Sequence, residues 1–168
     1  KAKLLWVDGA LLNPTAMFRT DFVRKHRLYY DASYAIDHDH VFYIAMMRSG
    51  ASFFSLKQPL LLYRRHAENV TNDDSGQDEV KTAVRTTLLP MFFPELTGTE
   101  GQMMLKLLRR SFSVNLREAS SAIAAADKAM RETRSVYGES RAGINRILEQ
   151  QVQVLLAALK RTQFRKPS

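Results

Sequence analysis

The second half of the chain follows a hydrophobic pattern with the period of an α-helix. Apolar residues recur three and four positions apart, so one side of each predicted helix is apolar and faces a core. The pattern predicts helices over 77–89, 99–112 and 116–136, and a last helix that begins after Ser140. We interpret these apolar stripes as core packing rather than a cofactor site, because this half does not concentrate the residue types that catalysis needs.

Local signals mark the predicted helix ends. Pro90 is expected to end the first of these helices, because proline lacks the amide hydrogen that the helix interior requires. The run from Thr99 to Gln102 fits a capping box at the start of the next helix. Gly138 is expected to break the third helix, and Ser140 can cap the last one.

The first half mixes short helices with β-rich runs. Thr20 is positioned to cap a helix over 20–26, and a second helix follows over 39–48. Runs rich in β-forming residues predict short strands at 4–7, 52–56 and 60–64, and a polar stretch predicts a loop over 67–76. The fold class that follows is α+β and mostly helical, with a few short strands before a helical C-terminal region.

This change of pattern divides the chain into two predicted units. Residues 1–75 hold most of the aromatic residues and all four histidines, whereas residues 76–168 are helical. A length of 168 residues suits one domain or slightly more. Because the chain begins at Lys1 and its first residues already resemble a strand, we expect it to be part of a longer polypeptide.

Composition narrows the function classes. The chain has no cysteine, which excludes disulfide scaffolds, thiolate zinc sites and a cysteine nucleophile. Its net charge of +8 lies mainly after Ser75, where fifteen basic residues face nine acidic ones. No run of five basic residues occurs, and no aromatic residues alternate with basic ones, so we expect no nucleic-acid partner. The longest apolar stretches are too short to span a membrane, and no signal peptide opens the chain, which favours a cytoplasmic protein.

Asp37, His38, Asp39 and His40 form the densest cluster of titratable residues. Aspartate and histidine bind Zn, Mn or Fe, but adjacent residues point in different directions on a helix or a strand, so at most two of the four would reach one ion. The alternative is a structural one, in which Asp37 or Asp39 caps a helix and the histidines are solvated. A metal-dependent hydrolase that also uses His66 is a further candidate.

His66 and Arg64 lie at the end of the last predicted strand, next to the polar loop. The junction of a strand and a loop is a common position for functional residues. Neighbouring residues of a strand alternate between its faces, so one of Arg64 and Arg65 can point inward toward a phosphate.

Four segments in this order together resemble a known family. They are Asn13-Pro14-Thr15-Ala16-Met17-Phe18-Arg19, Leu28-Tyr29-Tyr30-Asp31, residues 37–50 and residues 60–66, followed by Glu68-Asn69-Val70-Thr71. The combination resembles the acceptor-side, C-terminal part of bacterial family 2 glycosyltransferases, which have the GT-A fold. The resemblance implies that residues 1–75 are the acceptor-side half of such a domain, a partial GT-A unit.

The resemblance also implies roles for individual residues. The Glu-Asp motif of the family aligns with His38 and Asp39, which makes Asp39 the general base on the acceptor side and puts histidine in place of the usual glutamate. A shift of two residues would select Asp37 instead. His66 corresponds to the family's histidine near the donor diphosphate and the metal, with Arg64 beside it on the strand.

The implied function is an inverting transfer of a sugar from a nucleotide-sugar donor to a hydroxyl of a glycan or a lipid-linked acceptor. A divalent cation, Mg or Mn, would be held largely by residues outside this chain, and the isolated chain is expected to be inactive. The processive Gln-x-x-Arg-Trp signature is absent, which favours single additions. The alternative from another class is a helical interaction module whose basic last helix, with Lys160 and Arg161, makes a peripheral contact with an anionic membrane or a partner protein.

Overall fold

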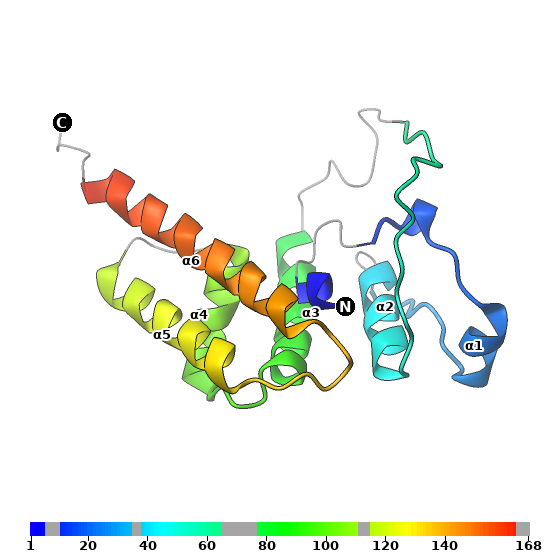
Figure 1. The fold of residues 1–168 in the computed structure, drawn as a ribbon, viewed down its shortest axis with the longest axis horizontal. Helices are drawn as coiled ribbons and strands as arrows, with labels where there is room; N and C mark the ends of the chain where they lie inside the picture. The colour runs from blue at the N-terminus through cyan, green and yellow to red at the C-terminus, as the bar shows by residue number, and fades with distance from the viewer. Residues whose placement is uncertain (6–10, 35–37, 65–76, 111–114, 164–168) are drawn as a thin grey trace.

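The computed structural model describes residues 1–5, 11–34, 38–64, 77–110 and 115–163. These residues form a mostly helical structure, as the sequence predicts, and Figure 1 shows the order of its elements. Two short 3-10 helices and six α-helices follow one another: η1 (Ala2–Leu5), η2 (Asn13–Thr15), α1 (Thr20–Lys25), α2 (His38–Arg48), α3 (Gln77–Phe92), α4 (Gly98–Arg109), α5 (Leu116–Glu132) and α6 (Arg141–Gln163).

The helices fall into a C-terminal bundle and a smaller N-terminal group. Helices α4, α5 and α6 pack against one another, and α3 packs against α4. Element η1 lies against both α6 and α2, and α2 also contacts α3, so the N-terminus connects the two groups (Figure 1). In the part of the chain that the structure describes, no helix is long and apolar enough to cross a bilayer.

One apolar core runs through both groups of helices. Helix α5 contributes a face of alanines to it, and such small side chains let neighbouring helices approach closely. The largest buried side chains come from η1, α2, α3, α4, α6 and the residue directly after α3, among them Leu4, Tyr43, Met47, Leu88, Phe92, Phe93, Met104, Leu107, Ile144 and Leu148. The predicted apolar stripes of the last helices are therefore core packing, although Leu116, which was expected on the stripe of α5, is exposed.

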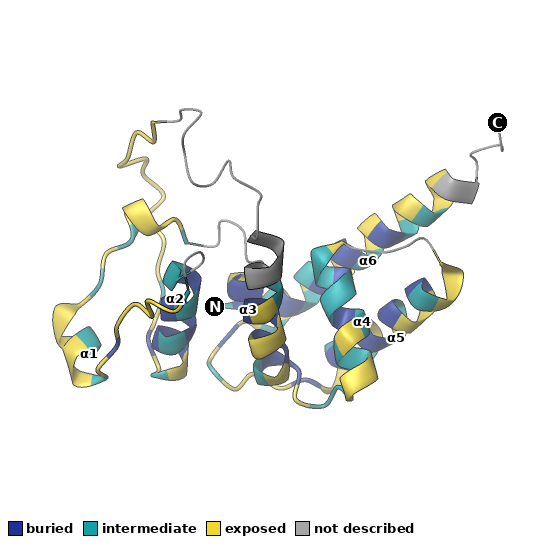
Figure 2. Ribbon diagram, turned by 180° about the vertical axis from the view of Figure 1, so that it is seen from behind, coloured by how far each residue is buried: buried dark blue, intermediate teal, exposed yellow. Residues whose placement is uncertain are grey.

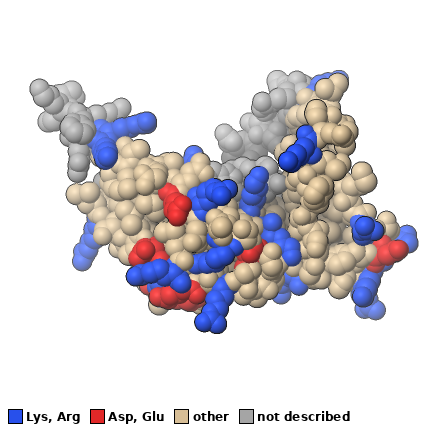
Figure 3. Space-filling model, in the orientation of Figure 1, with Lys and Arg blue, Asp and Glu red and all other residues tan. Residues whose placement is uncertain are grey.

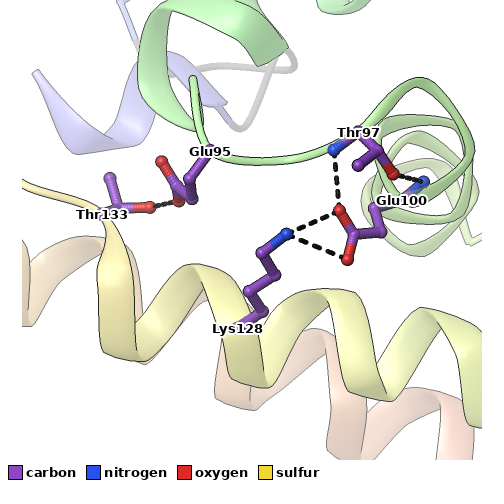
Figure 4. Close-up of polar contacts among 5 residues, drawn as sticks. All are labelled: Glu95, Thr97, Glu100, Lys128 and Thr133. Carbon is purple, nitrogen blue, oxygen red and sulfur yellow. Dashed lines mark hydrogen bonds and ion pairs between the residues drawn. The ribbon is translucent and has the colours of Figure 1, made fainter.

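The start of α4 is held by a capping box, shown in Figure 4. Thr97 is the N-cap residue: its backbone N–H donates to Glu100 Oε2 at 2.7 Å, and its hydroxyl oxygen accepts from the backbone N–H of Glu100 at 3.4 Å. Lys128 of α5 donates to both carboxylate oxygens of Glu100, at 2.9 and 3.1 Å. The predicted box at Thr99–Gln102 was thus two residues out of register, because Thr97 and Glu100 have the same spacing and lie where α5 supplies a lysine.

Proline 90 does not end its helix, contrary to the prediction. Helix α3 continues to Phe92 with Pro90 inside its last turn. Only one backbone hydrogen bond is lost there, to the carbonyl of Thr86 one turn earlier, and the helix ends two residues later. Burial of Leu89 and Phe92 explains the continuation, since both side chains reach the core only if the last turn stays helical.

The predicted strands are the main difference from the sequence analysis. No described residue belongs to a β-strand. Residues 52–56 and 60–64 lack helical structure, and no backbone hydrogen bond pairs them with another described segment. The expected strand at 4–7 begins inside η1, and its last two residues lie outside the described part of the chain. The predicted GT-A unit is therefore not visible as a sheet.

The remaining helix predictions are close to the structure. Helices α1 and α2 occupy the predicted positions, although Thr20 is the first helical residue of α1 rather than its cap. Ser140 caps α6 as predicted, since its hydroxyl oxygen accepts from the backbone N–H of Gly143 at 3.1 Å. Gly138, with φ of +67°, lies in the turn between α5 and α6, but it does not break the third predicted helix, because α5 already ends at Glu132.

Candidate functional site

The candidate site is built around the first turn of α2. Asp39 is the acidic residue of that turn and is half-buried. Its Oδ1 accepts a hydrogen bond from the backbone N–H of His40 at 2.8 Å, which fixes the orientation of the carboxylate. The other carboxylate oxygen, Oδ2, has no hydrogen-bond partner among the described residues. A carboxylate is favoured at this position because the backbone amides at a helix start carry partial positive charge.

Aromatic rings form a wall beside this carboxylate. Tyr30 stacks on Phe42 of α2, with ring centroids 4.6 Å apart and an angle of 18° between the planes. The rings of His38 and Tyr30 are nearly perpendicular, with their centroids 5.5 Å apart. Phe18 packs against Phe42 in the same edge-to-face manner, with the centroids 5.3 Å apart. Three segments separated along the chain thus pack together at the start of α2, and Tyr30 remains partly exposed at the surface.

Asn13 accepts hydrogen bonds from two tyrosines, Tyr30 of the aromatic wall and Tyr43 of α2. Its Oδ1 accepts from the hydroxyl of Tyr30 at 3.0 Å and from that of Tyr43 at 3.4 Å. Tyr43 is 1% exposed, so its hydroxyl needs a partner inside the protein. Asn13 itself is exposed, and its side-chain amide group forms the polar edge of the cluster.

The negative charge of Asp39 contributes to the raised pKa of both tyrosines. Burial raises the pKa of Tyr43 far above its usual value of 10, and the negative charge of Asp39 adds to the shift, followed by Tyr30. Burial also raises the pKa of Tyr30, and Asp39 again contributes. Both phenols are therefore hydrogen-bond donors at neutral pH.

The structure brings together only part of the predicted site. His38 and Asp39 lie side by side at the start of α2, next to Tyr30. Asp37 and His66 lie outside the described residues. Arg64 is described and exposed, and it forms no hydrogen bond or ion pair with another described residue. The described part of the chain thus holds no residue that is bonded to Arg64 and could form the predicted diphosphate site with it.

The described residues also do not assemble a complete metal site. Within the described ranges, no three His, Asp or Glu side chains gather closely enough to hold an ion. His38 and Asp39 alone offer too few ligands. The described residues therefore do not fit a divalent cation by themselves, and the residues predicted to contribute further ligands, Asp37 and His66, fall outside them.

Sequence reasoning missed Asn13, Tyr30 and Tyr43 as a unit. The sequence placed Asn13 and Tyr30 only in segments that carry the family resemblance, and Tyr43 only within the helix predicted over 39–48. The available signal was Tyr43 itself, because a tyrosine on the apolar side of a predicted helix requires a hydrogen-bond acceptor. Which residue accepts is set by tertiary structure, since Asn13 lies 30 positions earlier.

A separate pocket of about 220 Å³ lies between the beginnings of α4 and α5. It is lined by Thr99, Met103, Asn115, Arg117, Glu118 and Ser121, so none of the Asp39 cluster contributes to it. Asn115 is occupied as the N-cap of α5, where its Oδ1 accepts from the backbone N–H of Arg117 at 2.9 Å. The pocket follows from the way these two helix ends meet.

Comparison with known proteins adds no relative. No protein-family model matches the chain, and neither characterised proteins nor solved structures show a significant similarity to it. The functional assignment therefore depends on the residues and contacts described above and on the resemblance of segments between residues 13 and 71.

Proposed function

We propose that this chain supplies the acceptor side of an inverting glycosyltransferase of family 2 type, which moves a sugar from a nucleotide-sugar donor to a hydroxyl of a glycan or lipid-linked acceptor. The observation that carries the proposal is the environment of Asp39. Its carboxylate is half-buried at the start of α2, oriented by the backbone of His40, and keeps Oδ2 without a partner among the described residues.

The proposed reaction is one displacement at the anomeric carbon of the donor. The acceptor hydroxyl oxygen forms a new bond to that carbon, and the bond between the carbon and the diphosphate breaks, so the diphosphate leaves with the electron pair. The hydroxyl proton passes to Asp39 Oδ2, which acts as general base. A divalent cation would neutralise charge on the leaving diphosphate.

The neighbours of Asp39 support this assignment in two ways. Burial and Asp39 raise the pKa values of Tyr30 and Tyr43 further above neutral pH, so neither phenol is a base there. Tyr30 is partly exposed next to the carboxylate, with the ring of His38 nearly perpendicular to its own, and we propose that this aromatic corner contacts the acceptor sugar. His38 is thereby proposed as an acceptor-side residue.

The remaining proposed roles belong to Arg64, which has no hydrogen bond or ion pair with another described residue, and to Asp37 and His66, which lie outside the described residues. His66 and Arg64 are proposed to face the donor diphosphate, with His66 also near the cation, and Asp37 is the alternative base. These roles follow from the family resemblance only. A cytoplasmic protein with a peripheral membrane contact through its last helix is also proposed.

The test is sugar transfer by the full-length protein with Asp39→Asn. Loss of a general base lowers the rate by about 10²- to 10⁴-fold, and the substitution is isosteric, so the helix content measured by circular dichroism should not change. Asp21→Asn is the matched control, because Asp21 is an exposed aspartate in the first turn of α1. Unchanged turnover in the Asp39 variant would overturn the assignment.

A second candidate function rests on α6. This helix is 23 residues long, and its last turn carries the exposed basic residues Lys160 and Arg161 (Figure 1). Val154, one and a half turns earlier, is an exposed apolar residue. Such an arrangement fits a peripheral contact with an anionic membrane. Co-sedimentation of the chain with vesicles containing acidic lipid should fall in a Lys160→Glu/Arg161→Glu variant; equal sedimentation of both proteins, or none, contradicts it.

A further inference from the structure

The side-chain amide of Asn13 has no part in the transfer step proposed above, yet half of its hydrogen-bonding capacity is open. Its carbonyl oxygen Oδ1 accepts two hydrogen bonds, from the hydroxyl of Tyr30 at 3.0 Å and from that of Tyr43 at 3.4 Å. A carbonyl oxygen has two lone pairs, so both are used. The amide nitrogen Nδ2 has two N–H groups, and neither donates to another described residue. Because Asn13 is exposed, these two donors are open to a ligand.

The two tyrosines hold the amide in place. Tyr43 is 1% exposed and belongs to α2, so its hydroxyl is a donor fixed inside the protein. Figure 2 shows α2 as mostly buried, whereas the segments before it, which include Asn13, are mostly exposed. Two phenols that donate to one carbonyl also polarise the amide, which strengthens its N–H groups as donors. Asn13 is therefore anchored from the core and positioned in advance for a ligand outside it.

The amide lies in the same cluster as the proposed base. Both phenols that donate to Asn13 are close enough to Asp39 for its charge to contribute to their raised pKa values. Tyr30 also packs against His38, the neighbour of Asp39, with the ring centroids 5.5 Å apart. Asp39 Oδ2 can only accept a proton, whereas Asn13 Nδ2 can only donate. Tyr30 therefore connects a donor at its hydroxyl end with an acceptor near its ring.

This pair of groups suits a neutral ligand with two adjacent hydroxyls. One hydroxyl can donate to Asp39 while the oxygen of the next accepts from Asn13, because a hydroxyl is both donor and acceptor. A phosphate would be repelled by Asp39, and no described cationic side chain contributes to the pKa shift of either tyrosine. On the face drawn in Figure 3, most acidic side chains lie over the C-terminal bundle, away from α2. A sugar ring fits these requirements better than a lone alcohol, which can satisfy only one of the two groups.

We propose that Asn13 is an acceptor-binding residue that sets specificity: its Nδ2 donates to the hydroxyl oxygen next to the reacting hydroxyl, so the acceptor is a pyranose with two adjacent hydroxyls. This inference rests on the proposed transfer function, since it places the reacting hydroxyl at Asp39. Asn13 takes no part in the proton transfer, and Tyr30 and Tyr43 act on the acceptor by orienting the amide of Asn13.

The experiment measures binding of probe sugars to the 168-residue chain by NMR, with isotope-labelled asparagine. The probes are the methyl pyranosides of glucose, galactose and mannose, each added up to about 100 mM, a range suited to weak binding. At least one should shift the side-chain amide signal of Asn13. The signal of Asn115, an exposed asparagine at the N-cap of α5, should not move. Cyclohexanol, which has a single hydroxyl, and inorganic phosphate should each bind several-fold more weakly.

Asn13→Asp isolates the donor. An aspartate keeps an oxygen that accepts from Tyr43 but has no N–H, so it should weaken glycoside binding by about 2- to 10-fold, as expected for one hydrogen bond. Its midpoint in urea should stay closer to wild type than that of Asn13→Ala. Asn115→Asp is the matched control and should bind like wild type, since aspartate also suits an N-cap.

The proposal is overturned if no glycoside moves the Asn13 signal, if cyclohexanol or phosphate binds as well as the glycosides, or if Asn13→Asp binds like wild type. These failures differ from failure of the proposed function. Unchanged turnover in Asp39→Asn with a shifted Asn13 signal would overturn the transfer step. Lost turnover in Asp39→Asn with an unmoved Asn13 signal would overturn the role of Asn13.

Discussion

Asn13→Ala and Tyr43→Phe remove the same hydrogen bond, but we expect them to lower the free energy of unfolding by different amounts. Asn13→Ala leaves the hydroxyl of Tyr43 inside the protein, where the side chain is 1% exposed, without its described acceptor. An unsatisfied buried hydroxyl costs about 1–3 kcal/mol of unfolding free energy. Tyr43→Phe instead removes the hydroxyl and leaves Asn13 exposed to water, so it should cost only about 1 kcal/mol or less, since the bond of 3.4 Å is long.

The double variant separates this explanation from a general loss of packing. If Asn13 acts mainly by satisfying Tyr43, then Asn13→Ala adds little once the hydroxyl is gone, and the two effects together fall short of their sum by about 1 kcal/mol or more. Tyr30→Phe serves as the control, because its hydroxyl is at the surface and can bond to water. Its cost should stay below about 0.5 kcal/mol.

The assay is urea unfolding at 25 °C followed by circular dichroism of the helices. Wild type and variants should share one m-value, so that shifts of the midpoint report stability alone. The reasoning fails if Asn13→Ala is no more destabilising than Tyr43→Phe, or if the two effects simply add. Either result would mean that Tyr43 does not depend on Asn13.

Two further predictions concern the start of α4. Thr97→Ala should destabilise the chain by about 1 kcal/mol because it removes the N-cap, whereas Thr99→Ala, at the position that the sequence favoured, should cost less than half as much in urea unfolding. The second concerns pH: Lys128, followed by the N–H of Thr97, lowers the pKa of Glu100 from 4.5 to about 2. A carboxyl with a lowered folded-state pKa adds stability above the unfolded-state pKa and loses it as pH falls toward the folded-state pKa. Wild type should therefore lose stability relative to Glu100→Gln between about pH 5 and pH 2, and parallel pH profiles would contradict this.

The helical part of the fold was largely predictable because its signals are local. The apolar positions of α4 and α6 recur at helical spacing, and Met104, Leu107, Ile144 and Leu148 are buried as the pattern indicates. Errors arose where tertiary contacts decide between local alternatives. Two threonines, Thr97 and Thr99, could begin a cap, and only the position of α5 and its Lys128 favours the first.

The β-rich runs were misleading for a related reason. Residues 52–56 and 60–64 have β-forming composition, but a strand also needs a neighbouring strand to pair with. No described segment provides one, so the composition results in an exposed apolar segment instead.

The candidate site was predictable only in its local part. Asp39 could be placed in the first turn of a helix from the sequence, because the helix predicted over 39–48 is stopped by Ser49 and Gly50. Near Asp39, Asn13 is hydrogen-bonded to Tyr30, 17 positions later, and to Tyr43, 30 positions later. No local sequence pattern encodes such contacts. The hydrogen-bonded tyrosines are therefore a property of the folded chain.

The central claim is that Asp39 removes the proton from the acceptor hydroxyl, and a kinetic comparison in the full-length protein tests it most directly. Release of nucleoside diphosphate from nucleotide sugars should be measured with acceptor present for wild type, Asp39→Asn and Asp21→Asn. We predict that Asp39→Asn lowers kcat by about 10²-fold or more with little change in KM, as expected for a group that acts in the transition state, while Asp21→Asn matches wild type. A kcat for Asp39→Asn within the range of the Asp21 control would contradict the account.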